Sequence, residues 1–137
     1  MTLLSSETMH IVREQDVVLL LSRVREHSAR AGLQLLNQTK LLTAASELAR
    51  NMLRYANGGQ ATIEALRNNA RSGLKITFLD EGPGIPDIQQ AMRSGFSTGK
   101  GLGLGLPGAR RLVNEFDIQS KPGKGTCVTI TQWQDGR

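Results

Sequence analysis

The sequence has few cysteine and aromatic residues, and these shortages exclude several classes of protein. A single cysteine, Cys127, excludes an internal disulfide bond and a zinc site built on cysteine ligands. Aromatic residues make up 4% of the chain, which is too few for a base-stacking surface. The longest apolar run, Val17 to Leu21, is far shorter than the ~20 residues of a membrane-spanning helix. We therefore expect a soluble, cytoplasmic protein with no membrane partner.

Positive charge is in excess, with 17 Lys and Arg residues against 12 Asp and Glu residues and a net charge of +5. This excess is spread evenly over the two halves of the chain, without a basic tail or stripe. Proteins that bind duplex nucleic acid usually gather such residues on one face. We therefore expect no nucleic-acid partner, and we keep a basic nucleic-acid binder only as a minor alternative.

The length of 137 residues predicts one domain spanning residues 1–137. Hydrophobic periodicity and turn residues predict an α+β pattern without internal repeats. A first helix is expected to be capped by Asp16 and to end at Gly32, and a second to be capped by Asn37 and to stop at residues 57–59. The remaining expected elements are a closing helix at 106–116, a short helix starting near residue 87, and strands at 7–13, 60–67, 74–80, 117–120 and 125–133. Turn residues at 68–73 and at 121–124 predict two antiparallel hairpins, one of strands 60–67 and 74–80 and one of strands 117–120 and 125–133.

The second predicted helix carries Glu47 and Asn51 one turn apart, about 40° from each other around the helix axis. A mid-helix Asn is less favourable than Ala, and no local feature explains it. A solvated polar face is the plainer interpretation of this helix alone. A carboxylate and a carboxamide at this spacing can also hold hydrated Mg²⁺ while the carboxylate orients a hydroxyl group.

Two glycine-containing segments follow in the second half of the chain. The first, Asp80 to Pro86, begins where a predicted strand ends, so that the Asp carboxylate could accept a hydrogen bond from an exocyclic amine. The second, Gly99 to Gly108, leads directly into a predicted helix and suits a phosphate group. It does not follow a strand, which excludes a Rossmann fingerprint. Gly101 stands where a Walker-type loop requires Ser or Thr.

The order of these motifs resembles the Bergerat-type ATP-binding fold of the GHKL superfamily, which includes histidine kinases, Hsp90, gyrase B and MutL. Within it, the chain is similar to the small anti-sigma regulatory serine/threonine kinases, and especially to the switch kinases of the stressosome. The segments that carry the resemblance are residues 46–56, 73–88, 95–116 and 123–126. The resemblance implies a two-layer α/β sandwich in which helices cover one face of a mixed sheet and a lid closes over ATP.

Residue roles follow from the same resemblance. It implies that Glu47 is the catalytic carboxylate, that Asn51 ligates Mg²⁺, and that Asp80 holds the adenine amine, with Gly82 and Gly84 beneath the ring. The segment from residue 96 to 100 would be the ATP lid. Thr126 would help to close the adenine pocket, and the phosphates would be bound by Lys100, Gly101, Leu102, Gly103, Leu104 and Gly105.

The resemblance also implies a function. The chain is expected to transfer the γ-phosphoryl group of ATP to Ser or Thr residues of STAS-domain antagonist proteins, and then to bind and activate a PP2C-type phosphatase. His10 and His27 lie on a predicted strand and late in a predicted helix, so self-phosphorylation on His is not expected. Two alternatives remain: an anti-sigma factor kinase that sequesters a sigma factor, and a binding module that nucleotide orders without catalysis.

Overall fold

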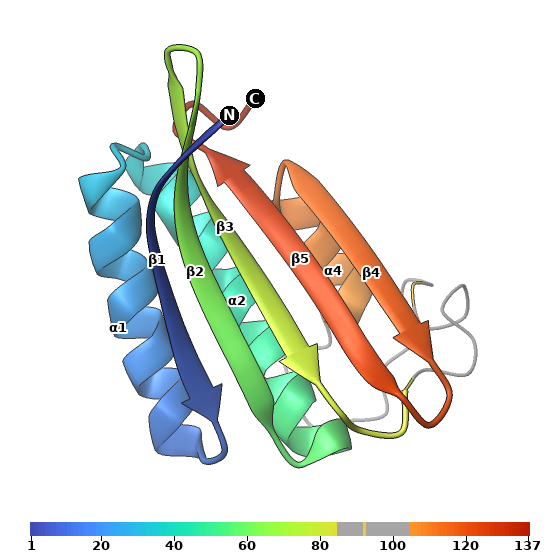
Figure 1. The fold of residues 1–137 in the computed structure, drawn as a ribbon. Helices are drawn as coiled ribbons and strands as arrows, with labels where there is room; N and C mark the ends of the chain where they lie inside the picture. The colour runs from blue at the N-terminus through green and yellow to red at the C-terminus, as the bar shows by residue number, and fades with distance from the viewer. Residues whose placement is uncertain (85–91, 93–104) are drawn as a thin grey trace.

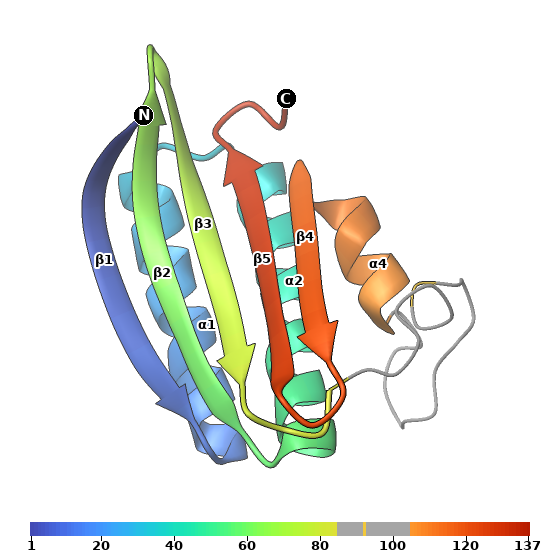
Figure 2. The ribbon, with the colours of Figure 1, turned by 45° about the vertical axis from the view of Figure 1, so that its right-hand side comes forward.

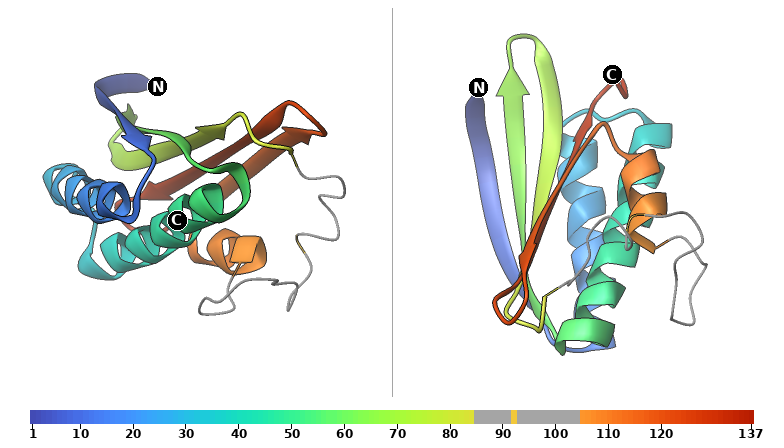
Figure 3. Two further views of the ribbon diagram at one scale, coloured as in Figure 1. Left: turned by 90° about the horizontal axis from the view of Figure 1, so that it is seen from below. Right: turned by 90° about the vertical axis from the view of Figure 1, so that its right-hand side faces the viewer.

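The computed structural model describes residues 1–84, 92 and 105–137, which form two layers (Figure 1). Strands make one layer and helices cover one of its faces (Figure 3), as expected for the two-layer sandwich. The described elements, in chain order, are β1 Thr2–Ile11, α1 Glu14–Arg30, α2 Leu35–Ala56, β2 Gly59–Asn68, β3 Arg71–Asp80, α4 Gly105–Leu112, β4 Glu115–Lys121 and β5 Gly125–Trp133. The short helix expected near residue 87 lies outside the described residues.

The strands are arranged in the order β1-β2-β3-β5-β4, and every pairing among the described residues is antiparallel. The expectation of a mixed sheet was therefore wrong in this detail. Both predicted hairpins, β2–β3 and β4–β5, are confirmed, and a hairpin forces its strands to be antiparallel. Helices α1 and α2 together return the chain to the end at which β1 stopped, so β2 also runs opposite to β1 (Figure 1).

The first two helices begin earlier than their predicted caps. Asp16 lies within the first turn of α1, where its carboxylate accepts hydrogen bonds from the backbone N–H groups of Val12 and Arg13 at 2.9 and 3.0 Å. These two bonds lower the pKa of the Asp16 carboxyl group. Asn37 lies inside α2 and is buried, with its side-chain N–H donating to the Gln134 carbonyl at 3.2 Å. A long-range contact therefore explains the residue that looked like a local cap.

The closing helix is shorter than predicted, since α4 ends at Leu112 and β4 begins at Glu115. Phe116, expected at the end of the helix, instead pairs with Ile130 across the sheet. Asn114 holds the junction: its backbone N–H donates to the Gln132 side chain at 2.8 Å, and its side-chain oxygen accepts from the backbone N–H of Trp133 at 2.8 Å.

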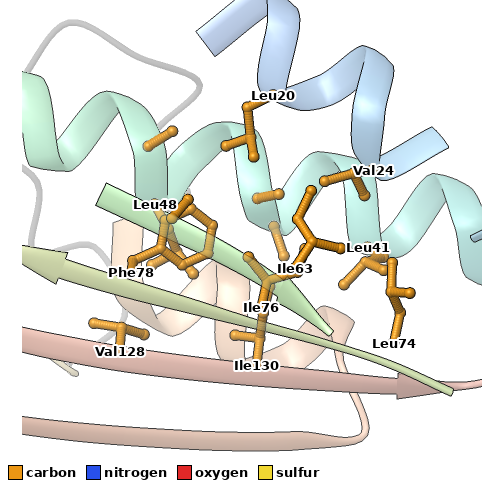
Figure 4. Packing of buried hydrophobic residues seen from close by; sticks show 14 of the residues in the cluster. Leu20, Val24, Leu41, Leu48, Ile63, Leu74, Ile76, Phe78, Val128 and Ile130 are labelled. Atoms are coloured by element: carbon orange, nitrogen blue, oxygen red, sulfur yellow. The ribbon is translucent and has the colours of Figure 1, made fainter. Parts of the chain in front are cut away.

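The core lies between the helices and the sheet (Figure 4). Its members are mostly aliphatic side chains, and full burial of a Val, Leu or Ile side chain stabilises a fold by about 1.5–3 kcal/mol. The labelled core side chains in Figure 4 are Leu20 and Val24 of α1, Leu41 and Leu48 of α2, Ile63 of β2, Leu74, Ile76 and Phe78 of β3, and Val128 and Ile130 of β5. No helix of the described residues is both long and apolar enough to cross a membrane.

A polar cluster ties α1 to the edge strand β1. The Glu7 carboxylate accepts from Nε of Arg23 at 2.9 Å and lies 2.8 Å from Nε2 of His27, which is buried. The hydrogen bond from Arg23, followed by that from His27, lowers the pKa of Glu7 below its ordinary value of 4.5.

Candidate functional site

The predicted site residues that the structure describes gather toward one end of the molecule. This end holds the C-terminal end of α2, the end of β3 and the start of β5, opposite the two chain termini (Figure 2). Glu47 and Asn51 lie on α2, Asp80 ends β3, and Thr126 lies near the start of β5. Residues 96–104, which include the expected lid and Lys100, Gly101, Leu102, Gly103 and Leu104, lie outside the described residues.

The carboxylate of Asp80 is held by backbone groups. Its Oδ1 atom accepts hydrogen bonds from the N–H of Gly82 at 2.9 Å and from the N–H of Thr126 at 3.3 Å. Asp80 and Thr126 are direct partners in the β3–β5 register. Two donors on one oxygen fix the orientation of the half-buried carboxylate. Oδ2 forms no recorded hydrogen bond with the described residues, so it can accept one from a ligand.

Glycines around Asp80 allow backbone segments to approach one another. A Cβ atom on Gly82 would lie 2.5 Å from Cβ of Ala56, at the end of α2. Gly84 has a φ of +79°, and a Cβ there would overlap the carbonyl oxygen of Lys121. Gly125, which the sequence analysis did not select, has a φ of +91°, and a Cβ there would overlap the Asp80 carbonyl oxygen. At the end of β3, these three glycines let backbone segments lie so close together that a side chain at any of the positions would clash.

Glu47 contacts the first residue of α4. Its Oε1 atom accepts a hydrogen bond from the N–H of Gly105 at 3.0 Å. The first N–H groups of a helix lack partners within the helix, and a carboxylate near them is also favoured by the helix dipole. Glu47 therefore caps α4 from the neighbouring helix α2, which links the predicted catalytic carboxylate to the helix that follows the glycine-rich segment.

Asn51 lies one helical turn beyond Glu47 and is half-buried. Its side chain forms no recorded hydrogen bond with the described residues. Within that same part of the chain, no group of three or more His, Cys, Asp or Glu side chains is placed to hold a metal ion. Mg²⁺ is often bound through one or two protein oxygens, with water and substrate phosphates completing its shell. The carboxamide oxygen of Asn51 fits this kind of site.

Thr126 has a second hydroxyl residue beside it that the sequence analysis missed. Ser120 of β4 is the direct partner of Thr126 in the β4–β5 register. The two hydroxyl oxygens lie 2.8 Å apart, and the Ser120 hydroxyl donates to the Gly125 carbonyl at 3.0 Å. Ser120 and Thr126 lie six positions apart in the chain, on either side of the turn between β4 and β5. The strand register brings their hydroxyl groups together, so Ser120 could have been found only by predicting that register.

A separate hollow of about 750 Å³ lies beside the edge strand β4. It is lined by residues of α4 and β4 that include Arg110, Phe116 and Ile118, together with Met92. Of the predicted site residues that the structure describes, none lines this hollow.

Comparison with known proteins identifies the superfamily. The family model described as histidine kinase-, DNA gyrase B-, and HSP90-like ATPase matches residues 36–135. The chain belongs to this family. The expected GHKL membership is confirmed, and the family's name as ATPases makes this an ATP-binding domain.

Two curated relatives show which members of this superfamily the chain resembles in sequence. The serine/threonine-protein kinase RsbT of Bacillus subtilis is 44% identical over 123 residues, covering 90% of this chain and 92% of the relative. An anti-sigma F factor of Thermoanaerobacter sp. is 38% identical over 99 residues, covering 66% of each chain. The expected similarity to the small regulatory serine/threonine kinases is therefore confirmed.

Solved structures share the fold. The structure of the RsbU and RsbW domains of a Mycobacterium tuberculosis protein has a TM-score of 0.66 at 18% identity, covering 98% of this chain and 34% of that chain. The mycobacterial sensor histidine kinase MprB has a TM-score of 0.54 at 16% identity, covering 97% of this chain and 100% of that chain. At these identities the likeness supports the fold alone, and it confirms the expected α/β architecture.

Proposed function

We propose that the chain is an ATP-dependent serine/threonine protein kinase that acts in the cytoplasm as a partner-switching regulator. Its substrates are STAS-domain antagonist proteins, and once released it binds and activates a PP2C-type phosphatase. The observation that carries the proposal is the 44% identity to a serine/threonine-protein kinase over 90% of the chain. The orientation of Asp80 and the pairing of Glu47 with Gly105 are consistent with it.

The nucleotide would be held from the end of β3. Oδ1 of Asp80 is taken by two backbone donors, which leaves the other carboxylate oxygen to accept from the exocyclic amine of adenine. The close approach of Gly82 to Ala56 keeps the segment after β3 flat against α2. The start of α4 contributes backbone N–H groups and a favourable dipole near the phosphates.

Phosphoryl transfer depends mainly on positioning and on stabilisation of charge. In the proposed reaction, the substrate hydroxyl oxygen bonds to the γ-phosphorus, the bond to the β–γ bridging oxygen breaks, and ADP leaves. Glu47 accepts the hydroxyl proton, and the N–H of Gly105 keeps its carboxylate oriented. Asn51 supplies an oxygen ligand for Mg²⁺, which offsets negative charge on the phosphate oxygens when it is bound.

Calorimetric titration tests the binding half of the proposal. ADP and ATP are titrated with and without Mg²⁺ into the wild type, Asp80→Asn and Asn51→Ala. We expect Asp80→Asn to weaken binding in both conditions, and Asn51→Ala to remove the dependence on Mg²⁺. Asp117→Asn, an exposed carboxylate of β4, is the matched control and should bind normally. Absence of binding by the wild type at millimolar nucleotide would refute the proposal.

Product analysis tests catalysis. The protein is incubated with γ-labelled ATP and a STAS-domain protein, and the label is followed to phosphoserine or phosphothreonine. Unchanged ATP in a stable complex would instead support a nucleotide-ordered binding module. The similarity to anti-sigma F factors favours one further candidate, an anti-sigma factor kinase. Pull-down with sigma factors and STAS-domain proteins separates the two, because capture of a sigma factor alone would support this candidate.

A further inference from the structure

Helix α4 is held by hydrogen bonds at both of its ends. At its start, the N–H of Gly105 donates to Oε1 of Glu47 in α2 at 3.0 Å. Between the two ends, α2 is the element that α4 contacts most, and Figure 3 shows the two helices side by side on one face of the sheet. The position of α4 therefore depends on α2 and on what holds its far end.

The far end of α4 is anchored by Asn114, two residues beyond the helix. Its Oδ1 atom accepts from the backbone N–H of Trp133 at 2.8 Å, and its own N–H donates to Oε1 of Gln132 at 2.8 Å and to the Thr131 carbonyl at 3.1 Å. Gln132 is buried, and its Nε2 atom donates to Oδ1 of Asn37 at 3.1 Å. The end of α4 is thus tied to β5 and, through Gln132, to the first turn of α2.

Backbone groups at both ends of this series of amides fix the direction of each side chain. A backbone N–H can only donate, so Gln132 turns its oxygen toward Asn114 and its NH₂ group toward Asn37. Asn37 then presents its oxygen to Gln132, and its NH₂ group donates to the Gln134 carbonyl at 3.2 Å. Only one arrangement of the amides satisfies all of these contacts. A satisfied buried network of this kind rigidifies the elements that it joins.

A small rotation about this anchor would displace the start of α4 by a distance that matters for binding. At a rise of about 1.5 Å per residue, the eight residues of α4 span about 12 Å. A tilt of about 5° about the Asn114 end would therefore move Gly105 by roughly 1 Å. Such a shift would displace the donor that orients Glu47 and the N–H groups proposed to lie near the phosphates.

We propose that Asn114 is a positioning residue for the nucleotide phosphates: together with Gln132, it fixes the far end of α4 so that the start of the helix stays beside Glu47 and the phosphates. The inference rests on the proposed function, in which ATP binds with its phosphates near the start of α4. Asn114 acts through the helix and does not itself contact the nucleotide.

The test measures how much the β-phosphate adds to nucleotide affinity. Calorimetry with Mg²⁺ present gives the dissociation constants of ADP and AMP, and their ratio separates the phosphates from the adenine contact at Asp80. Asn114→Ala removes the side-chain acceptor, and the φ of Asn114 is not positive, so Ala suits the backbone. We expect the preference for ADP over AMP to fall about five-fold, the size of one favourable interaction with a helix terminus, while AMP binds nearly as before. Asn114→Asp keeps an oxygen that can accept from the N–H of Trp133 and should keep the preference.

Two further variants separate positioning from a loss of stability. Arg23→Ala removes a hydrogen bond to Glu7 at the opposite edge of the sheet from α4 (Figure 1), and should lower Tm without changing the ratio. Gln132→Met removes the other half of the anchor and should lower the ratio in the same direction; it replaces Asn114→Ala if that variant does not fold. An unchanged ratio in Asn114→Ala, or an equal loss of affinity for both nucleotides, would overturn the inference.

Failure of the proposed function gives a different result. A wild type that binds neither ADP nor AMP refutes nucleotide binding itself, and the inference with it. A wild type that prefers ADP, with the same preference in Asn114→Ala, leaves the kinase proposal intact and overturns the role of Asn114 alone.

Discussion

Replacement of Glu47 should affect stability and phosphoryl transfer separately. In the structure the Glu47 carboxylate both caps α4 through Gly105 and occupies the position proposed for the catalytic base. Ala removes the hydrogen-bond acceptor and the charge together. Gln removes the charge but keeps an oxygen that can accept from the N–H of Gly105. Comparison of Glu47→Ala with Glu47→Gln therefore distinguishes the two roles.

The size of each effect can be worked from the contact. Loss of a capping acceptor costs about 1 kcal/mol, and loss of a carboxylate beside a helix N-terminus costs roughly 0.3–1 kcal/mol more. For a domain of this length, a total of about 1–2 kcal/mol lowers Tm by roughly 3–7 °C. Glu47→Gln loses only the charge, so its Tm should fall by roughly 1–3 °C. Both variants should lose about 10²–10⁴-fold in transfer rate, the usual contribution of a general base.

Thermal unfolding gives the Tm values, hydrogen exchange of the α4 amides reports whether the helix frays, and labelled ATP with a STAS-domain protein gives the transfer rate. Glu26→Ala, which removes a more exposed carboxylate from α1, is the control and should leave transfer unchanged. Wild-type transfer by Glu47→Gln would refute the catalytic role. An unchanged Tm and unchanged exchange in Glu47→Ala would refute the capping role.

Three further changes test the surroundings of the site and the core. Gly82→Ala places a Cβ atom 2.5 Å from Cβ of Ala56, so we expect a cost of about 1–3 kcal/mol and weaker binding of ADP, measured by thermal unfolding and calorimetry; wild-type values in both would contradict the close packing. Gln132→Leu removes a buried side chain that donates to Oδ1 of Asn37 at 3.1 Å and accepts from the N–H of Asn114 at 2.8 Å, and it should lower the free energy of unfolding by about 1–3 kcal/mol in urea titrations; a neutral result would show that the two bonds together contribute nothing. The pKa of Glu7 lies below 4.5 in the folded protein, so the stability that its carboxylate contributes is complete above that pH and is lost as the pH falls through the folded pKa. Between about pH 5 and 3, Glu7→Gln should therefore lose less stability than the wild type, and identical plots of unfolding free energy against pH would exclude a contribution from Glu7.

Most elements of the fold could be predicted because their signals are local. The apolar spacing from Leu41 to Met52 predicted α2, and the turn residues predicted both hairpins. The motif positions of Glu47 and Asp80 were also readable from the chain, because each depends on a short pattern. Predictions at the boundaries were less accurate. Asn37 resembled a helix cap but makes its hydrogen bonds with Gln132 of β5 and with Gln134 just beyond it, 95 and 97 positions away, and no local pattern indicates these partners.

By itself, the sequence determined which segments form helices and strands, and which glycines and polar residues suit a nucleotide. These properties arise from backbone preferences and from hydrophobic periods of a few residues. Only the tertiary structure decided that the sheet is entirely antiparallel, that Glu47 caps α4, and that Ser120, Thr126 and Asp80 share one row. The reason is that strand order and register bring together residues far apart in the chain, and no local pattern indicates which residues these are.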